Sequence, residues 1–331
     1  MANWLQKQWH SYTRWHLFLL PVSWLFFSLV FIRKLLYRLG WLKSTRLPVP
    51  VIVVGNINVG GTGKTPLVIW LVEQLQQAGF KPGVISRGYG GKATQSPMPV
   101  YANSDARQVG DEPVLIAMRT QCPVFIHRNR VSAGKALLSA HPECSIIISD
   151  DGLQHYRLQR DIEIVVIDGS QGLGNGALLP AGPLRELKSR LNNVDALVVN
   201  GQLQKNLNVT TPVIDMHLQA DAFYNLKALH QTCEPQDFAN QSVLAVAGIG
   251  NPGRFFQQLT NMGIQFSPKS YPDHYIYNET DFVSQNDNLV LMTEKDAVKC
   301  RTFAQSNFWV LPVKAVIKSD LMTIILNKLR P

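Results

Sequence analysis

A glycine-rich segment followed by lysine and threonine is the first feature of the sequence that could carry chemistry. It reads Asn58-Val59-Gly60-Gly61-Thr62-Gly63-Lys64-Thr65, with an apolar run before it and a helical stretch after it. Backbone N–H groups of such a loop surround a phosphate, the lysine reaches the β- and γ-phosphates, and the threonine hydroxyl holds Mg²⁺. Asn58 replaces the first glycine of the pattern G-x-x-x-x-G-K-[ST], but asparagine tolerates left-handed backbone angles, so we expect the turn to survive. An ordinary glycine-rich turn is the alternative; the strand–loop–helix setting favours nucleotide binding.

Two adjacent carboxylates follow another apolar run. Asp150 and Asp151 come directly after residues 146–149 and precede a glycine. Their mutual repulsion is costly unless a cation or hydrogen-bond donors offset it, so one of them could face Mg²⁺ while its neighbour faces the acceptor of a phosphoryl transfer. We name Asp150 for the metal and Asp151 for the acceptor; the sequence does not distinguish the two carboxylates. A solvated turn is the alternative interpretation. Gln154 and His155 follow at once, and we expect them to bind a hydroxylated ligand.

Two further segments resemble nucleotide-binding motifs only weakly. Guanine-specific domains carry Asn-or-Thr-Lys-x-Asp, whereas residues 293–296 read Thr-Glu-Lys-Asp, with the lysine one place late. Residues 248–253 match G-x-G-x-x-G, but Pro252 restricts their backbone, and Asp273 lies in a segment unlike the strand end where a ribose partner is expected. We therefore interpret residues 248–253 as a turn that starts a helix.

Hydrophobic residues make up 46% of the chain, which excludes a protein that is only a disordered tail. Short β-rich runs alternate with helical stretches from residue 49 onward. Apolar strands separated by helices predict an α/β fold with a P-loop-type, mostly parallel sheet and helices on both faces, followed by a second, smaller α/β domain. The expected strands are 49–54, 83–86, 123–127, 145–149, 162–167, 194–199, 242–247, 289–292 and 308–313, and the expected helices are 66–78, 112–119, 130–140, 254–262 and 320–329. The predicted organisation is an N-terminal membrane-associated segment (1–46), a P-loop kinase core (47–210), a linker (211–230) and a smaller C-terminal domain (231–331).

Residues 1–46 hold most of the excess positive charge. The net charge of the 331-residue chain is +9, and this segment contributes +7 because it has seven Lys and Arg residues and no acidic one. The remainder is nearly neutral, so nucleic-acid binding is disfavoured. Residues 17–32 form an apolar run flanked by tryptophans and basic residues, which favours membrane contact over a cleaved signal peptide or a buried core helix. The run could span the bilayer or lie in one leaflet. The four cysteines form no C-x-x-C pair, which disfavours disulfides and zinc and indicates a reducing cytoplasm: Cys122, Cys144, Cys233 and Cys300.

Several motifs, taken in order, resemble the tetraacyldisaccharide 4'-kinase family of lipid A synthesis. The likeness covers nearly the whole chain, and the family's phosphate loop is not strict at the position of Asn58. Beside that loop, the matching segments are Ser86-Arg87-Gly88-Tyr89-Gly90-Gly91-Lys92, Gly110-Asp111-Glu112-Pro113, residues 150–156 (DDGLQHY), residues 179–186 (LPAGPLRE) and residues 292–300 (MTEKDAVKC).

The resemblance implies an ATP-dependent, Mg²⁺-using kinase that phosphorylates the 4'-hydroxyl of a lipid-linked tetraacylated glucosamine disaccharide 1-phosphate, forming the lipid A precursor lipid IVA. The enzyme would act at the cytoplasmic face of the bacterial inner membrane, and no obligate protein partner is evident. By similarity to the family, Asp111 is the base that accepts the hydroxyl proton, supported by His274 from the second domain. On residue type alone, Asp111 could equally be a helix N-cap, and His274 a structural histidine.

The family likeness also gives weight to two loops. Arg87, Gly88 and Tyr89 would contact the disaccharide, as would Arg185, whose guanidinium could also stabilise the transferring phosphate oxygens, while Glu186 would assist Mg²⁺. Turn geometry or surface ion pairing is the alternative for these residues. The rival function is a membrane-attached P-loop ATPase or GTPase that switches a partner protein, which needs a positioned water but no machinery for a sugar hydroxyl.

Overall fold

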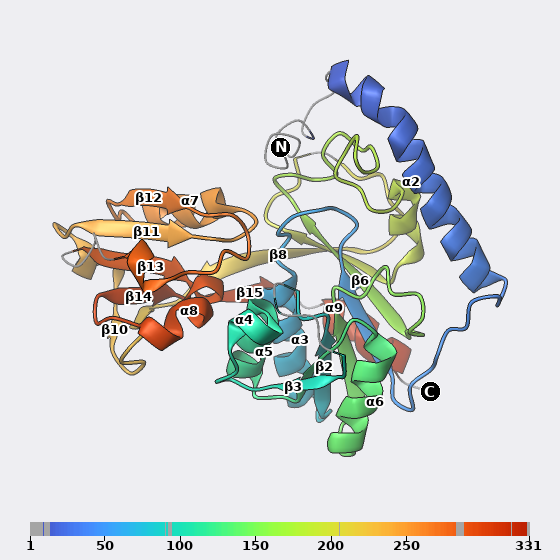
Figure 1. Ribbon diagram of the computed structural model, residues 1–331, viewed down its shortest axis with the longest axis horizontal. Helices are drawn as coiled ribbons and strands as arrows, with labels where there is room; N and C mark the ends of the chain where they lie inside the picture. Colours follow the sequence, from blue (N-terminus) through green and yellow to red (C-terminus); the bar gives the residue numbers. More distant parts are fainter. Residues whose placement is uncertain are drawn as a thin grey trace.

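A mostly parallel sheet forms the larger part of the computed structural model, which describes residues 9, 14–89, 91, 95–204, 206–282, 288–318 and 320–329 (Figure 1). Its strands lie in the order β15-β8-β7-β6-β1-β5-β2-β4-β3, and only the pairs at the two edges, β15 with β8 and β3 with β4, are antiparallel among the described residues. The bounds are β1 Val51–Gly55, β2 Pro82–Ser86, β3 Met98–Val100, β4 Val124–Ile126, β5 Ile146–Asp150, β6 Ile162–Asp168, β7 Ala196–Asn200, β8 Val213–Ala220 and β15 Val313–Ile317.

Hydrophobic cores cover both faces of this sheet. In β1, Ile52 and Val54 pack into one core with helices α3 and α5, whereas Val51 and Val53 pack into the other core with α6. Successive strand residues point to opposite faces, so a run of consecutive apolar residues is what a doubly covered strand requires. The predicted α/β class is confirmed. The helices of this part are α3 Lys64–Gln77, α4 Ala106–Val109, α5 Asp111–Thr120, α6 Arg130–Ala140 and α9 Asp320–Leu329, with a 3₁₀ helix η1 at Lys188–Asn193.

A second, six-stranded sheet lies beside the first, with order β10-β9-β14-β13-β11-β12 (Figure 1). Its central strands are parallel, and β9 and β10 are antiparallel additions at one edge. The bounds are β9 Phe223–Asn225, β10 Thr232–Cys233, β11 Val243–Ala247, β12 Ser267–Ser270, β13 Leu289–Thr293 and β14 Phe308–Leu311, with helices α7 Pro252–Asn261 and α8 Glu294–Cys300 and 3₁₀ helices Pro235–Phe238, Glu279–Asp281 and Arg301–Phe303.

The chain crosses between the two sheets twice, and the predicted boundaries differ from the structure for this reason. Residues 211–230, predicted as a linker, contain β8 of the first sheet and β9 of the second. The predicted strand 308–313 is split at Pro312, which lacks the N–H that a continuous ladder needs. After this break, β15 pairs with β8, and α9 places Leu321 and Ile325 in the core around α3. The C-terminal residues therefore complete the first sheet and not the second.

We call each sheet with its packed helices a unit. Helix α2, Arg14–Arg38, runs along the outside of the first unit (Figure 1). Among the described residues it is the one helix long and apolar enough to cross a membrane, and little of its apolar stretch is buried in the protein. Trp24, Leu25 and Leu29 are each at least 60% exposed. Ser23, on the other side of the helix, is buried against a loop: its hydroxyl donates to the carbonyl of Leu178 and accepts from the N–H of Ala181. Residues 1–8 and 10–13 of the predicted membrane-associated segment lie outside the described residues.

Candidate functional site

The glycine-rich loop joins β1 to α3 at the carboxyl edge of the first sheet, where parallel α/β sheets place their ligands. Gly63 caps α3 with φ 96°, and Gly60 has φ 120°, so both occupy backbone angles that favour glycine. A Cβ on Gly63 would lie 2.4 Å from the side-chain nitrogen of Asn200, which donates to the carbonyl of Thr62. Among the described residues, the N–H groups of residues 60–63 donate to no protein acceptor. This arrangement suits a phosphate at the helix N-terminus.

Asn58 keeps the loop in place by a different means from the one predicted. Its backbone is not left-handed; it forms an isolated bridge with Leu184, and its side-chain nitrogen donates to the carbonyl of Gly172 at 2.6 Å. The N–H of Val59 donates to the carbonyl of Pro183 at 2.9 Å. The first position of the motif therefore fastens the phosphate loop to residues 172–184. A glycine there would lack the side-chain bond to Gly172.

Asp151 lies between two cations that sequence reasoning placed at the site. Its carboxylate is 3.5 Å from the Lys64 ammonium and 3.5 Å from the Arg185 guanidinium. Burial raises the pKa of Asp151, but Lys64, Arg185 and Arg130 outweigh burial and hold its pKa below the usual value. Asp151 is therefore ionised at neutral pH and links the lysine of the phosphate loop to the predicted substrate loop.

Asp150, one residue earlier on β5, has the opposite electrostatic character. It is fully buried, and burial, with the charges of Glu112 and Asp151, raises its pKa to about 7. One carboxylate oxygen accepts from Ser86 at 3.1 Å, whereas the other is buried without a hydrogen-bond partner among the described residues. A buried carboxylate oxygen without a partner beside a phosphate loop fits Mg²⁺, which takes one or two protein oxygens and completes its shell with phosphate and water. Asp150 and Thr65 are the residues that could hold the ion.

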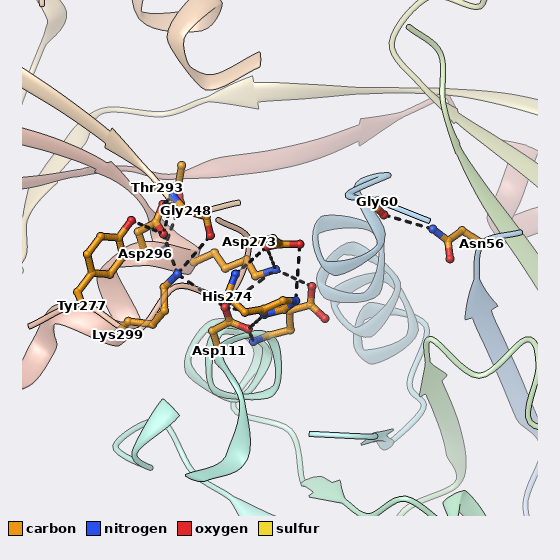
Figure 2. Close-up of polar contacts among 12 residues, drawn as sticks. Asn56, Gly60, Asp111, Gly248, Asp273, His274, Tyr277, Thr293, Asp296 and Lys299 are labelled. Atoms are coloured by element: carbon orange, nitrogen blue, oxygen red, sulfur yellow. Dashed lines mark hydrogen bonds and ion pairs between the residues drawn. The ribbon is translucent and has the colours of Figure 1, made fainter. Parts of the chain in front are cut away.

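Asp111 and His274 meet at the junction between the two units (Figure 2). Asp111 begins α5, and its carboxylate lies 3.0 and 3.1 Å from Nδ1 of His274. Asp111 is 3% exposed, and burial raises its pKa; the hydrogen bond with His274 and the charges of Lys295, His274 and Lys299 outweigh burial, so its pKa is lowered. Asp111 also accepts from the N–H of Glu112 at 2.9 Å. It is thus a first-turn helix residue that is paired with an imidazole.

The loop Gly248–Asn251 lies between the phosphate loop and Asp273, the neighbour of this pair. A Cβ on Gly250 would lie 2.6 Å from the backbone nitrogen of Gly61 and 3.3 Å from the carboxylate of Asp273, the neighbour of His274. Asp273 in turn lies 3.6 Å from Nε2 of His274. The predicted proton acceptor and the predicted phosphate cradle therefore lie at one junction between the two sheets.

Gln154 and Glu186 form one network with Tyr156. Glu186 is 3% exposed and accepts from Gln154 at 2.8 Å and from the Tyr156 hydroxyl at 2.7 Å. The Tyr156 ring lies 5.9 Å from the Tyr37 ring of α2. Each oxygen of Glu186 accepts one of these hydrogen bonds, so the carboxylate positions this network, and its contact with Mg²⁺ stays a prediction.

The remaining predicted substrate residues lie in separate places. His155 accepts at Nε2 from the N–H of Arg130 at 3.3 Å; burial and the surrounding arginines lower its pKa to about 4, so the ring is neutral. Tyr89 is 61% exposed, and its ring lies 4.9 Å from that of His274. Gly88 has φ 71°, which turns the exposed Arg87 and Tyr89 out of the end of β2. These two side chains remain at the surface of the site.

Sequence reasoning missed several residues that complete the site. Ser86 holds Asp150, and the guanidinium of Arg130 donates to the carbonyls of both paired aspartates at 3.2 and 3.4 Å. Ser86 ends a predicted strand, which was an available signal; Arg130 opens a helix and gave none. Lys295 and Lys299 were also missed, although their i, i+4 spacing in residues 292–300 places them on one helix face.

Known proteins resemble this chain over nearly its whole length. Residues 15–330 match the family model described as Tetraacyldisaccharide-1-P 4'-kinase. The tetraacyldisaccharide 4'-kinase of Methylobacillus flagellatus is 51% identical over 328 residues, which cover 99% of this chain and 96% of that protein. The Pasteurella multocida protein of the same name is 50% identical over 330 residues, covering 99% and 98%. The crystal structure of LpxK from Aquifex aeolicus in complex with ATP superposes with a TM-score of 0.80 at 30% identity, covering 95% of this chain and 99% of that one.

Proposed function

The chain belongs to the tetraacyldisaccharide-1-phosphate 4'-kinase family, and we propose that it transfers the γ-phosphate of ATP to the 4'-hydroxyl of a lipid-linked tetraacylated glucosamine disaccharide 1-phosphate. The observation that carries this proposal is the buried Asp111–His274 pair, whose neighbour Asp273 adjoins Gly250 and through it the phosphate loop. A switch that only hydrolyses nucleotide needs a positioned water. A buried carboxylate–imidazole pair that joins the two units suits removal of a proton from an alcohol.

The residues of the chain divide the reaction between them. The N–H groups of the phosphate loop and Lys64 bind the triphosphate and offset its charge. Asp111 accepts the proton of the sugar hydroxyl while the hydroxyl oxygen bonds to the γ-phosphorus and the bond from that phosphorus to the β-phosphate oxygen breaks, which releases ADP. Nδ1–H of His274 donates to Asp111 and fixes its orientation. Asp151 pairs with both Lys64 and Arg185 and so orients the Lys64 ammonium.

We place Mg²⁺ at Asp150 and Thr65. When bound, the ion neutralises charge on the β- and γ-phosphates. The buried oxygen of Asp150 that has no hydrogen-bond partner among the described residues supports this assignment. Asp150 must be ionised to bind the ion, so binding releases a proton from this residue at pH values below about 7.

We also propose that α2 seats the enzyme in the cytoplasmic face of the inner membrane. Its exposed apolar side chains include Trp24, Leu25 and Leu29, and Arg33 and Lys34 follow toward the C-terminal end. Cationic residues at the end of an apolar helix favour an anionic cytoplasmic leaflet. The network of Tyr156 and Glu186 joins this helix to the site, since the Arg33 guanidinium lies 5.9 Å from the centre of the Tyr156 ring.

The proposed function is tested by incubating the full-length enzyme in detergent micelles with [γ-³²P]ATP, Mg²⁺ and tetraacyldisaccharide 1-phosphate. The label should appear in a lipid product phosphorylated at the 4' position. A parallel reaction without the disaccharide measures hydrolysis. Labelled inorganic phosphate at equal rates in both reactions, with no labelled lipid, would contradict the kinase and favour the ATPase switch.

A further inference from the structure

Helix α8 directs two lysines toward the N-terminus of α5. The ammonium of Lys299 lies 3.9 Å from Oδ2 of Asp111, and that of Lys295 lies 4.0 Å from the same oxygen. The exposed fractions of the two lysine side chains are 6% and 16%, and that of the Asp111 side chain is 3%. Two cations thus share a nearly dry space with the carboxylate that the proposed reaction uses. Coulomb interactions at this distance are much stronger in such a space than in water.

The ammonium of Lys299 is held in place by its own unit (Figure 2). It lies 2.8 Å from the carboxylate of Asp296, 3.3 Å from the carbonyl oxygen of Gly248 and 4.9 Å from the centre of the Tyr277 ring. Asp296 is fully buried and accepts from the N–H of Gly248, the hydroxyl of Tyr277 and the hydroxyl of Thr293. Because every partner of Asp296 comes from the second unit, Lys299 has a fixed position before it meets Asp111.

Lys295 contacts two further carboxylates besides Asp111 at this junction. Its ammonium lies 3.0 Å from Glu112 on α5 and 3.2 Å from Asp273 beside His274. Burial lowers the pKa of Lys295, but Glu112, Asp111 and Asp273 outweigh burial, so the pKa is raised and the side chain stays charged. Lys295 therefore spreads its charge over three carboxylates, whereas Asp111 is the second acidic group within 4.0 Å of Lys299.

Asp111, His274 and Lys299 line one small cavity of about 10 Å³ together with Arg107. The ionisable groups that face or adjoin Asp111 from all the elements packed on it are His274, Lys295, Lys299, Arg107, Glu112 and Asp273. The base and Lys299 therefore face the same water-sized space.

We propose that Lys299, fixed by Asp296, is a positioning residue for Asp111: it holds the carboxylate ionised and oriented until it accepts the proton of the acceptor hydroxyl. This inference rests on the proposed function of Asp111 as the base. In this role Lys299 acts through Asp111. Because Lys299 belongs to the second unit and Asp111 to the first, the base is fully prepared only while α8 contacts α5.

The alternative is that Lys299 merely balances the buried charge of Asp296. The two roles separate in a double variant. Lys299→Met alone leaves Asp296 buried without its cation, which is destabilising. Asp296→Asn with Lys299→Met removes both charges and keeps one amide oxygen that can accept from both the Gly248 N–H and the Tyr277 hydroxyl, which meet the same oxygen of Asp296. The double variant should fold like the wild type and still lack the cation at Asp111.

The experiment measures kcat, KM for each substrate, the pH dependence of kcat and the thermal midpoint of the full-length enzyme with [γ-³²P]ATP and tetraacyldisaccharide 1-phosphate. In both variants kcat at pH 7 should fall about 10- to 100-fold, as for a misplaced catalytic group, with both KM values changed less than about twofold. The acidic limb of the kcat profile should move to higher pH, since loss of a neighbouring cation makes Asp111 easier to protonate. Lys299→Arg should restore most of kcat. Lys314→Met, which removes an exposed partner of Asp221, serves as the matched control.

A double variant with wild-type kcat and an unmoved acidic limb would overturn the inference. So would a loss of kcat that follows the loss of folded protein while the limb stays in place, because that pattern belongs to a purely structural lysine. Failure of the wild-type enzyme to label the lipid overturns the proposed function instead, so the two failures are distinguishable.

Discussion

Replacing Asp150 by asparagine should make the metal-free enzyme more stable at pH 8 while removing its activity. Asp150 is fully buried, and one of its oxygens has no partner among the described residues. A protonated carboxyl and an amide both place a donor at that oxygen and both let the other oxygen accept from Ser86. Asp150→Asn therefore resembles the protonated side chain at every pH and avoids burying a negative charge.

The size of the effect follows from the raised pKa of Asp150. A carboxyl whose folded pKa exceeds its unfolded pKa favours the folded state below the unfolded value, and this contribution is lost as pH rises through the folded value. With an ordinary value of 3.8 and a folded value of about 7, the wild type loses at most about 4 kcal/mol relative to the variant across this range. Between pH 5 and pH 7 the difference should grow by about 2–3 kcal/mol and then level off.

Urea unfolding in detergent micelles with EDTA and no nucleotide, at pH 5, 6, 7 and 8, measures this difference. Asp151→Asn is the matched control at the next position. Its carboxylate is stabilised by Lys64 and Arg185, and a carboxyl with a lowered pKa loses this stabilisation only as pH falls below its ordinary value of 3.8. The difference in stability between the wild type and this second variant should therefore stay nearly constant from pH 8 to pH 5. Parallel curves for the wild type and Asp150→Asn, or an Asp150→Asn protein that is less stable at pH 8, would refute the argument from burial.

Three further outcomes are expected. Lys64→Ala should lower transfer by on the order of a thousandfold, because it removes a preorganised cation at the phosphates; residual transfer by the folded variant within tenfold of wild type would contradict its role. Leu321→Ala on α9 should cost about 2–5 kcal/mol of unfolding free energy measured by urea titration, since Leu321 is fully buried in the core around α3; a cost near zero would mean that α9 does not pack there. Leu25→Asp on α2 should weaken co-sedimentation with phosphatidylglycerol vesicles at least about tenfold, because Leu25 is 62% exposed and its apolar surface would leave the bilayer; unchanged sedimentation would contradict membrane seating through this helix.

The sequence was sufficient to predict elements whose signal is local. The consecutive apolar residues of β1 and the loop up to Lys64 are read within a dozen positions, and the structure has both. The pairing of β15 with β8 joins residues about a hundred positions apart, and no periodicity in either strand specifies a partner. This is why residues 313–329 were assigned to the wrong unit.

The same distinction applies within the site. The types and order of Lys64, Asp111 and Asp151 are chemical signals that a sequence displays. The hydrogen bonds of Glu186 with Gln154 and Tyr156 could not be predicted, because they arise only when two loops meet. Asn58 was expected in a left-handed turn; its bond to Gly172 depends on a contact 114 residues away.

The two crossings between the sheets lie side by side. β8 continues into β9 after two residues, β14 continues into β15 after Pro312, and the N–H of Asp221 donates to the carbonyl of Pro312 at 3.1 Å. The second unit is thus an insertion whose entrance and exit share one joint, so it can swing about that joint without stretching the chain or disturbing the first sheet. A mutation far from the nucleotide, at Ala222 or Pro312, would alter how often Asp111 meets its partners while every residue of the phosphate cradle stays intact.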